Sequence, residues 1–305
     1  MNAIITASEL KRRLDGADVI LLDLLTPEDY AARHIPGARN ACVYEMVFLD
    51  RVAECTHDRE CALVVYDATG TTRAAATASE KLERAGYRNI SILDGGLAAW
   101  EATGYPVERP EAIDTAEAPV RDGVYRVDTG ASVVEWTGRN INNRHYGRIA
   151  LAKGEVTFVG GALAGGRFVL DMTSITNLDL QDATWREILI RHLLSDDFFD
   201  VERYPTASFE VTGFEPLSGA TPGTPNGIVT GNLTIRDVTR PVTFPAVIYP
   251  QEEGSIKAQA AFDIDRTLWN VCYGSGKLYE RLGMHLVHDL ISLELFLVAR
   301  PAMAT

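Results

Sequence analysis

The apolar residues of this 305-residue chain follow two different patterns along the sequence, and the pattern changes near residue 120. Before it, short apolar runs such as Val19–Leu22 and Leu63–Tyr66 alternate with helix-forming segments. That alternation is typical of a parallel sheet with helices on both faces. From about Val124 onward, apolar and polar residues alternate one by one and turn signals recur roughly every ten residues. The sequence therefore predicts two domains, each large enough to bury its own core.

We place the domains at residues 1–110 and 124–305, joined by an exposed connector at 111–123 that has no apolar period. The first is predicted to be a doubly wound α/β domain. The second is predicted to be an all-β antiparallel, lipocalin-like barrel of about eight strands with one short helix, because full closure would remove exposed strand edges.

Two local predictions in the second domain can be compared with a structure. Lys153-Gly154 is interpreted as a turn between two strands. Thr184–Leu194 is predicted to be a helix that covers one end of the barrel or packs on its outside. The apolar residues at helical spacing in that segment are Trp185, Ile188, Leu189 and Leu193.

Val64–Thr77, VVYDATGTTRAAAT, is predicted to run from a strand through a tight loop into a helix. Backbone N–H groups converge at such a junction, and the helix dipole adds partial positive charge, so the loop favours an anion. Here Asp67 begins the loop, Gly70 lies within it and Arg73 ends it.

Three motifs in the first domain, in order, resemble the signatures of the rhodanese (sulfurtransferase) family. They are LLDLLTPEDYAARHIPGARNA, VVYDATGTTRAA and LDGGLAAWEATGYPVE. In an active member, the position of Asp67 is a cysteine that carries the transferred sulfur as a persulfide. A carboxylate cannot do so, because sulfur transfer needs a soft nucleophile. The resemblance thus implies a catalytically silent module with a degenerate loop at Asp67, Gly70 and Arg73.

The role predicted for Asp67 is structural. Its carboxylate would accept the loop amides, pair with Arg73 and cap the following helix. Two enzymatic alternatives remain open at the 67–73 loop. One is sulfur transfer through another thiol, and the other is phosphoester hydrolysis with Asp67 as nucleophile, which would require Mg²⁺. A third alternative is a protein that only binds partners.

Three segments of the second domain resemble the YceI-like family of polyisoprenoid-binding, lipocalin-like proteins. They are HLLSDDFFDVERYPTASFEVT, VTGNLTIRDVTRPVTF and AAFDIDR. The resemblance implies an elongated barrel whose apolar lumen binds an isoprenoid-type lipid or quinone, in a binding or carrier role. The bulky side chains predicted to contact such a ligand are Trp136, Tyr146, Phe158, Phe168, Phe209, Phe262 and Trp269.

Charge, hydropathy and cysteine content bear on which partners the protein binds and in which compartment it is expected. The net charge is −13 and no run of Lys or Arg is longer than Lys11-Arg12-Arg13, which argues against nucleic acid and against anionic membrane surfaces. No apolar run approaches a membrane span, and the first residues do not resemble a signal peptide. The four cysteines are unpatterned, so free thiols in the cytoplasm are expected. No cofactor or metal is predicted, and the sequence leaves a homodimer open.

Overall fold

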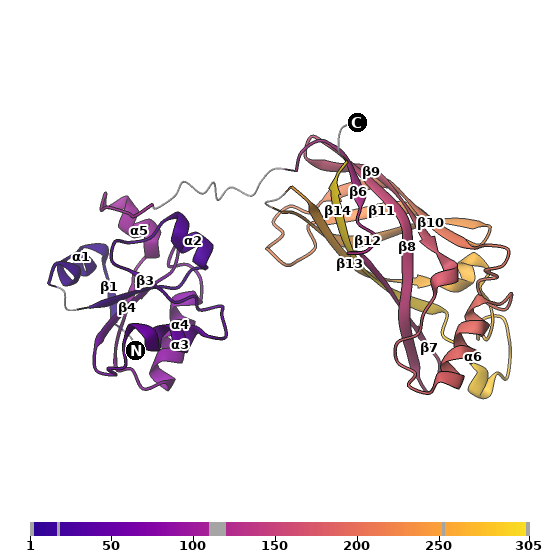
Figure 1. Ribbon diagram of the computed structural model, residues 1–305, viewed down its shortest axis with the longest axis horizontal. Helices are drawn as coiled ribbons and strands as arrows, with labels where there is room; N and C mark the ends of the chain where they lie inside the picture. The colour runs from indigo at the N-terminus through magenta and orange to yellow at the C-terminus, as the bar shows by residue number, and fades with distance from the viewer. Residues whose placement is uncertain (1–2, 17–18, 110–119, 252–253, 303–305) are drawn as a thin grey trace. The chain divides into compact units, whose positions relative to one another are not determined.

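The computed structural model describes residues 3–16, 19–109, 120–251 and 254–302. The chain divides into two compact units, residues 1–116 and 117–305. Both fold classes predicted from sequence are confirmed: the first unit is α/β with a parallel sheet, and the second is an antiparallel barrel (Figure 1). Most of the predicted connector 111–123 lies outside the described residues.

The first unit is built on a five-stranded parallel sheet with the order β1-β5-β4-β2-β3. Its strands are β1 (Ala3–Ile5), β2 (Ile20–Asp23), β3 (Arg39–Asn40), β4 (Ala62–Tyr66) and β5 (Asn89–Leu93). Its helices are α1 (Ala7–Asp15), α2 (Pro27–Ala32), α3 (Phe48–Cys55), α4 (Ala74–Arg84) and α5 (Gly96–Ala102). Thr6 and Thr26 begin α1 and α2, each accepting a hydrogen bond from an amide of the first turn, as expected of N-caps.

Both faces of this sheet are covered by helices. Adjacent residues of β4 point to opposite sides, so that Val65 packs with α3 and α4 while Val64 packs with α1 and α5. The fully apolar strand β4 therefore has a core on each face, as expected for a central parallel strand. Strand β4 ends at Tyr66, and the loop that begins at Asp67 follows directly.

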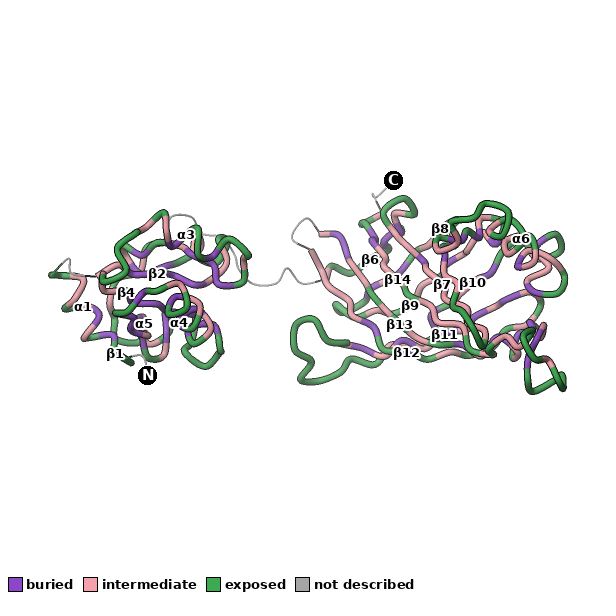
Figure 2. Tube along the Cα trace, turned by 90° about the horizontal axis from the view of Figure 1, so that it is seen from below, coloured by how far each residue is buried: buried purple, intermediate pink, exposed green. Residues whose placement is uncertain are grey.

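The second unit is an antiparallel barrel. Its strands are β6 (Gly123–Val127), β7 (Val133–Arg139), β8 (Arg144–Val159), β9 (Ala162–Asp171), β10 (Thr206–Pro216), β11 (Gly227–Ile235), β12 (Val238–Pro250), β13 (Ile256–Asp265) and β14 (Leu290–Pro301). Strands β7 to β14 pair in sequence, and β14 pairs back with β7 to close the ring. Strand β6 lies between β8 and β14 at one end. Along β11 every second residue is buried (Figure 2), so one face of each strand points inward.

The turn predicted at Lys153-Gly154 is wrong, because β8 runs unbroken through it for 16 residues. An irregular register between Leu151 and Lys153 lets the strand bend without ending. Gly154 serves close packing instead, since a Cβ there would lie 2.8 Å from Val127 Cγ2 and 3.0 Å from Phe168 Cδ1.

Among the described residues, three short 3-10 helices and one α-helix interrupt the barrel strands. They are η1 (Met172–Ser174), α6 (Ala183–Leu194), η2 (Arg266–Trp269) and η3 (Gly283–His285). Helix α6 begins one residue earlier than predicted, and Asp182 caps it by accepting from the amides of Thr184 and Trp185. Leu189 and Leu193 face the barrel interior, so α6 covers one end of the barrel. Trp185 and Ile188, from the same predicted apolar stripe, are exposed.

Candidate functional site

The loop between β4 and α4 is organised around a buried carboxylate. Asp67 is 2% exposed. One of its oxygens accepts hydrogen bonds from the backbone amides of Thr69 at 3.2 Å and Gly70 at 2.5 Å. The other oxygen accepts from the Thr72 hydroxyl at 2.7 Å. The donors that would face a bound anion in this loop thus already bind an anion that belongs to the chain.

Helix α5 holds the loop in this form. The amide of Leu97 donates to the carbonyl of Asp67 at 2.8 Å, and the amide of Ala98 donates to the carbonyl of Ala68 at 2.9 Å. A Cβ at Gly70, whose φ is +70°, would lie 2.6 Å from the backbone nitrogen of Gly95. The loop can approach the helix this closely only because Gly70 carries no side chain.

The pairing predicted between Asp67 and Arg73 is absent from the described ion pairs. Arg73 is exposed and stands at the N-cap of α4 without a side-chain capping bond. The oxygens of Asp67 are engaged by two loop amides and Thr72. The predicted cap is indirect, because the Thr72 hydroxyl that donates to Asp67 also accepts from the amide of Ala74 at 3.3 Å.

A second buried acid, Asp23, lies at the end of β2, beside β4. Burial raises the pKa of Asp23 to about 6, although hydrogen bonds from Tyr66 and from the Leu25 amide act in the opposite direction. Burial likewise raises the pKa of Tyr66, whose hydroxyl accepts from the amide of Ile35 at 3.1 Å. These contacts join the end of β2, the end of β4 and the segment at Ile35. They indicate that Asp23 and Tyr66 have a structural role.

The second candidate site is a cavity of about 440 Å³ inside the barrel. Its wall is predominantly apolar. The inward faces of β13 and β14 contribute every second residue from Ile256 to Ile264 and from Ile291 to Leu297. Phe244 of β12 and Phe262 of the neighbouring strand β13 both line the cavity and stack on each other, with ring centroids 4.1 Å apart and an interplanar angle of 3°. Because protein interiors are close-packed, a void of this size with an apolar lining is suited to an apolar occupant.

The structure places most of the predicted lumen residues at this cavity. Those in its wall are Trp136, Phe158, Phe168, Phe209 and Phe262. Tyr146 is not in the wall, and its ring lies 5.3 Å from the guanidinium of Arg144. Trp269 is also outside it, 1% exposed, with its indole N–H donating to the carbonyl of Leu233 at 2.9 Å. Contact of any of the seven with a ligand stays a prediction.

Sequence reasoning missed four aromatic residues of the wall: Phe198, Phe199, Phe244 and Tyr273. The signal for Phe244 was available, because alternation along β12 puts Val242, Phe244 and Ala246 on one face. Phe198 and Phe199 lie in the segment after α6, where no strand period applies. Only the fold brings that segment across the end of the barrel.

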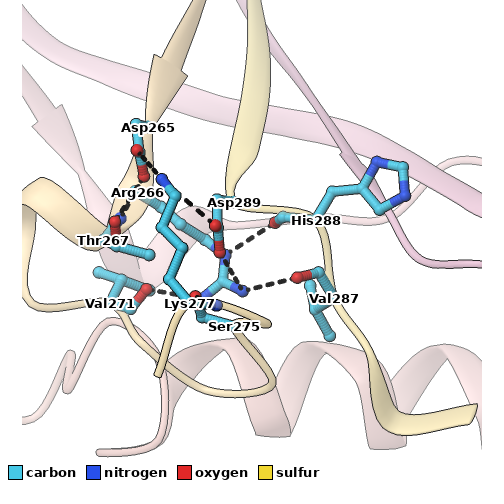
Figure 3. A network of polar contacts seen from close by, with 9 residues as sticks. All are labelled: Asp265, Arg266, Thr267, Val271, Ser275, Lys277, Val287, His288 and Asp289. Carbon is cyan, nitrogen blue, oxygen red and sulfur yellow. Dashed lines mark hydrogen bonds and ion pairs between the residues drawn. The ribbon is translucent and has the colours of Figure 1, made fainter. Parts of the chain in front are cut away.

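The cavity reaches the surface near α6. Three exposed residues of its wall, Met284, His285 and His288, lie in the loop between η2 and β14. Buried Arg266 fastens this loop, donating to the carbonyls of Val271 at 2.5 Å, His288 at 3.0 Å and Val287 at 3.1 Å (Figure 3).

The ends of the same loop are also joined by a lysine. Lys277 Nζ lies 2.5 Å from Asp265 and 3.3 Å from Asp289 (Figure 3). The loop that borders the opening is therefore a fixed part of the barrel.

Comparison with known families agrees with this architecture. Residues 125–299 match the YceI-like domain. The chain belongs to the YceI-like family. Residues 6–103 match the rhodanese-like domain, so the loop at Asp67 belongs to a rhodanese-like unit fused to a YceI-like barrel.

Individual relatives match parts of the chain. An HTH-type transcriptional regulator, Rv0324 of Mycobacterium tuberculosis, is 38% identical over 104 residues, which are 34% of this chain and 44% of that protein. The chain thus spans less than half of that regulator. A sulfurtransferase of Allochromatium vinosum is 32% identical over 111 residues, 36% of this chain and 98% of that protein.

A solved polyisoprenoid-binding domain from Saccharophagus degradans, described as implicated in plant cell wall breakdown, is 14% identical. The match covers 58% of this chain and 98% of that chain, with a TM-score of 0.43.

Two further observations concern the described residues of this YceI-like protein. They contain no cluster of three or more His, Cys, Asp or Glu that could hold a metal ion. None of the helices among them is both long enough and apolar enough to cross a bilayer.

Proposed function

We propose that the YceI-like barrel binds one long apolar ligand of isoprenoid type, such as a lipid or quinone tail, and acts as a binding or carrier unit. The cavity of about 440 Å³ inside the barrel carries this proposal. Barrels of eight strands are wide enough to hold one small ligand, and ligand pockets span about 300–1,000 Å³. Each buried CH₂ contributes about 0.8 kcal/mol, so a chain of several isoprene units would bind without covalent chemistry.

The decisive experiment is organic extraction of the purified full chain followed by mass spectrometry. We expect an isoprenoid-type lipid in about one copy per barrel. A barrel that yields no lipid and does not bind an added isoprenoid quinone in detergent would refute the proposal.

A matched pair of variants locates the ligand. Ala260 lines the cavity, whereas its neighbour Ala261 is exposed on the outer face of β13. Ala260→Trp should fill the lumen and abolish binding of the quinone, while Ala261→Trp should bind it as the unchanged chain does. Circular dichroism confirms that both variants fold. Equal binding by the two variants would place the ligand elsewhere.

We further infer that the rhodanese-like unit does not transfer sulfur and serves as a structural or recognition module. The internal anion at Asp67 supports this, because its carboxylate occupies the Thr69 and Gly70 amides that would stabilise a persulfide or a bound anionic donor. A thiosulfate–cyanide assay and a phosphatase screen on the full chain should both give no turnover. Turnover that Asp67→Ala abolishes would establish an enzyme at this loop instead.

We place this function in the cytoplasm. The four cysteines are free thiols, which supports a reducing compartment. Cell fractionation with detection of the full chain tests this, and recovery in an exported fraction would contradict it.

A further inference from the structure

The wall of the barrel cavity becomes polar at the end where the cavity opens. Four of the six histidines in the chain lie in this wall: His145, His192, His285 and His288. They come from β8, from α6 and from the loop between η2 and β14. An isoprenoid chain that fills the apolar part of the cavity would therefore have its head group near these side chains.

His145 belongs to the inward face of β8. Ile149 and Leu151, four and six residues further along this strand, also line the cavity. The Nδ1 atom of His145 lies 2.8 Å from Oδ2 of Asp179, in the segment before α6. Its Nε2 atom forms no hydrogen bond with any residue that the structure describes. One ring nitrogen of His145 is thus anchored, and the other is left for a ligand.

Asp179 determines which nitrogen of His145 carries the proton. Its Oδ1 atom accepts from the backbone amide of Tyr146 at 2.9 Å and from the side-chain amide of Asn177 at 2.6 Å. Partial burial opposes ionisation, but these hydrogen bonds and the one with His145 hold the pKa of Asp179 below its ordinary value. An ionised carboxylate only accepts, so Nδ1 of His145 donates to it, and Nε2 of the neutral ring is a hydrogen-bond acceptor.

His192 repeats this arrangement on α6. Its Nε2 atom lies 3.3 Å from Oδ2 of Asp197, and its Nδ1 atom has no hydrogen bond with the described part of the chain. The imidazole ring is held edge-on against the rings of Phe198 and Tyr273, with centroids 4.9 Å and 4.5 Å away. A second histidine of the cavity wall is therefore anchored by a carboxylate through one nitrogen only.

The opening does not favour an anionic head group. The segments that surround it, residues 139–146, 178–203 and 264–289, contain eight Lys and Arg and ten Asp and Glu. A phosphate bound there would be repelled by this excess of acids. An uncharged head group avoids that repulsion.

Two arginines border the cavity, and both are engaged elsewhere. Arg139 donates to the hydroxyl of Ser292 at 2.8 Å. Ser292 lies between Ile291 and Leu293, which line the cavity, so its side chain points to the outer face of β14. The guanidinium of Arg266 donates to three backbone carbonyls (Figure 3). The histidines are therefore better placed than the arginines to bind a head group.

We propose that His145 and His192 form a head-group subsite that binds an uncharged isoprenoid through a hydroxyl group, as in a prenyl alcohol or the quinol form of an isoprenoid quinone. This rests on the proposed function, since it names the head group of the ligand in the same cavity. A hydroxyl can donate to a neutral ring nitrogen, whereas an ether oxygen or a quinone carbonyl can only accept. The apolar tail supplies most of the affinity, and the histidines select the head group.

The test compares three ligands that share one tail: geranylgeraniol, its methyl ether and geranylgeranyl phosphate. Each is titrated calorimetrically into the full chain in detergent. We expect the alcohol to bind about tenfold more tightly than the ether, as one hydrogen bond allows, and more tightly than the phosphate. An isoprenoid quinone should bind more tightly after reduction to the quinol. Whichever of the alcohol and the quinol binds more tightly identifies the kind of hydroxyl that the subsite accepts.

A matched pair of variants on β8 locates the subsite. His145→Phe keeps a ring in the wall but removes the acceptor, so it should lose most of the preference for the alcohol over the ether. Tyr146→Phe is the control, because Tyr146 is the next residue and lies outside the cavity wall. It should keep the preference of the unchanged chain.

Asp179→Asn tests Asp179 as a positioning residue. The asparagine oxygen would continue to accept from Tyr146 and Asn177, so its NH₂ group would face Nδ1 of His145. The ring proton would then move to Nε2, which becomes a donor. This variant should bind the alcohol and the ether equally and should prefer the quinone to the quinol. NMR of ¹⁵N-labelled histidine should show Nδ1–H for His145 in the unchanged chain and Nε2–H in the variant.

The outcomes separate this subsite from the function on which it rests. Equal binding of the alcohol and the ether by the unchanged chain would refute the subsite and leave isoprenoid binding intact. Tighter binding of the phosphate than of the alcohol, or an Nε2–H tautomer of His145 in the unchanged chain, would also overturn it. If none of the ligands binds, the proposed function fails and the subsite fails with it.

Discussion

The carboxylate of Asp67 accepts a hydrogen bond from the backbone N–H of Gly70 at 2.5 Å, within the loop that in a sulfurtransferase would surround a persulfide. The same oxygen accepts from the Thr69 amide, so the loop is folded around its own anion. The loop amides and the N-terminal end of α4 favour a negative charge, and the side chain of Asp67 places a carboxylate among those amides.

Removing that anion should destabilise the first unit. Asp67→Ala leaves two amides and the Thr72 hydroxyl without their acceptor, which should lower the free energy of unfolding by about 2–4 kcal/mol. Asp67→Asn retains one acceptor oxygen and should lose less. Amide hydrogen exchange of residues 62–84, followed by mass spectrometry, measures the change. The control is Thr71→Ala, at an exposed position of the same loop, and equal protection in all three variants would contradict the structural role.

Replacing Asp67 with cysteine should restore a persulfide site if the loop keeps its shape. The Thr69 and Gly70 amides would then face a thiolate, lower its pKa and stabilise the persulfide formed when the thiolate takes the outer sulfur of thiosulfate and sulfite leaves. Intact-protein mass spectrometry should show the addition of one sulfur atom to Asp67→Cys and none to Asp67→Ser. A cysteine variant that folds but never carries sulfur would show that the rest of the pocket is unsuited to the donor.

Asp23 should make stability depend on pH. Its pKa is raised to about 6 in the folded protein from an ordinary value of 3.8, so folding favours the protonated form. This contribution is complete below about pH 4 and is lost as the pH rises through about 6, costing about 3 kcal/mol in total. Urea unfolding of the unchanged chain and of Asp23→Asn should therefore diverge between pH 4 and pH 7, with the variant gaining in relative stability.

The control for that experiment is Asp50→Asn, which removes an exposed carboxylate from the first turn of α3. A difference between the unchanged chain and Asp23→Asn that does not vary with pH would show that Asp23 titrates normally.

Arg266 should be essential to the loop that borders the cavity opening. Arg266→Met leaves the carbonyls of Val271, Val287 and His288 without their donor in a site that is 2% exposed, at a cost of about 3–5 kcal/mol. Thermal unfolding and proteolysis of residues 271–289 measure the effect. Lys277→Met is the matched control, since Lys277 joins the same elements from an exposed position and should matter much less. Similar losses in both variants would contradict a special role for Arg266.

Local sequence signals predicted the first unit closely. The observed β4, loop and α4 follow Val64–Thr77 as expected. Helix α3 was not predicted, because its N-cap residue, Val47, provides no side-chain hydrogen bond. The predicted pairing of Asp67 with Arg73 was wrong. Sequence spacing places the two residues at the ends of one loop, but it does not say which hydrogen-bond donors are nearest to the carboxylate.

In the barrel, the alternation of apolar and polar residues predicted antiparallel strands but not the continuity of β8. A glycine after a lysine has the same sequence signature in a turn and in a strand that must pack tightly. Only the neighbours Val127 and Phe168, which come from other strands, distinguish the two.

The sequence by itself determined the two fold classes, the absence of a cysteine at position 67 and the apolar faces of the barrel strands, because each depends on residues close together in the chain. The tertiary structure alone decided that the barrel is hollow, that Asp67 is bound by its own loop, and that Phe198 and Phe199 lie in the wall of the cavity. These properties depend on distances between residues far apart in sequence, and such distances are fixed only when the strands pair and the cores pack.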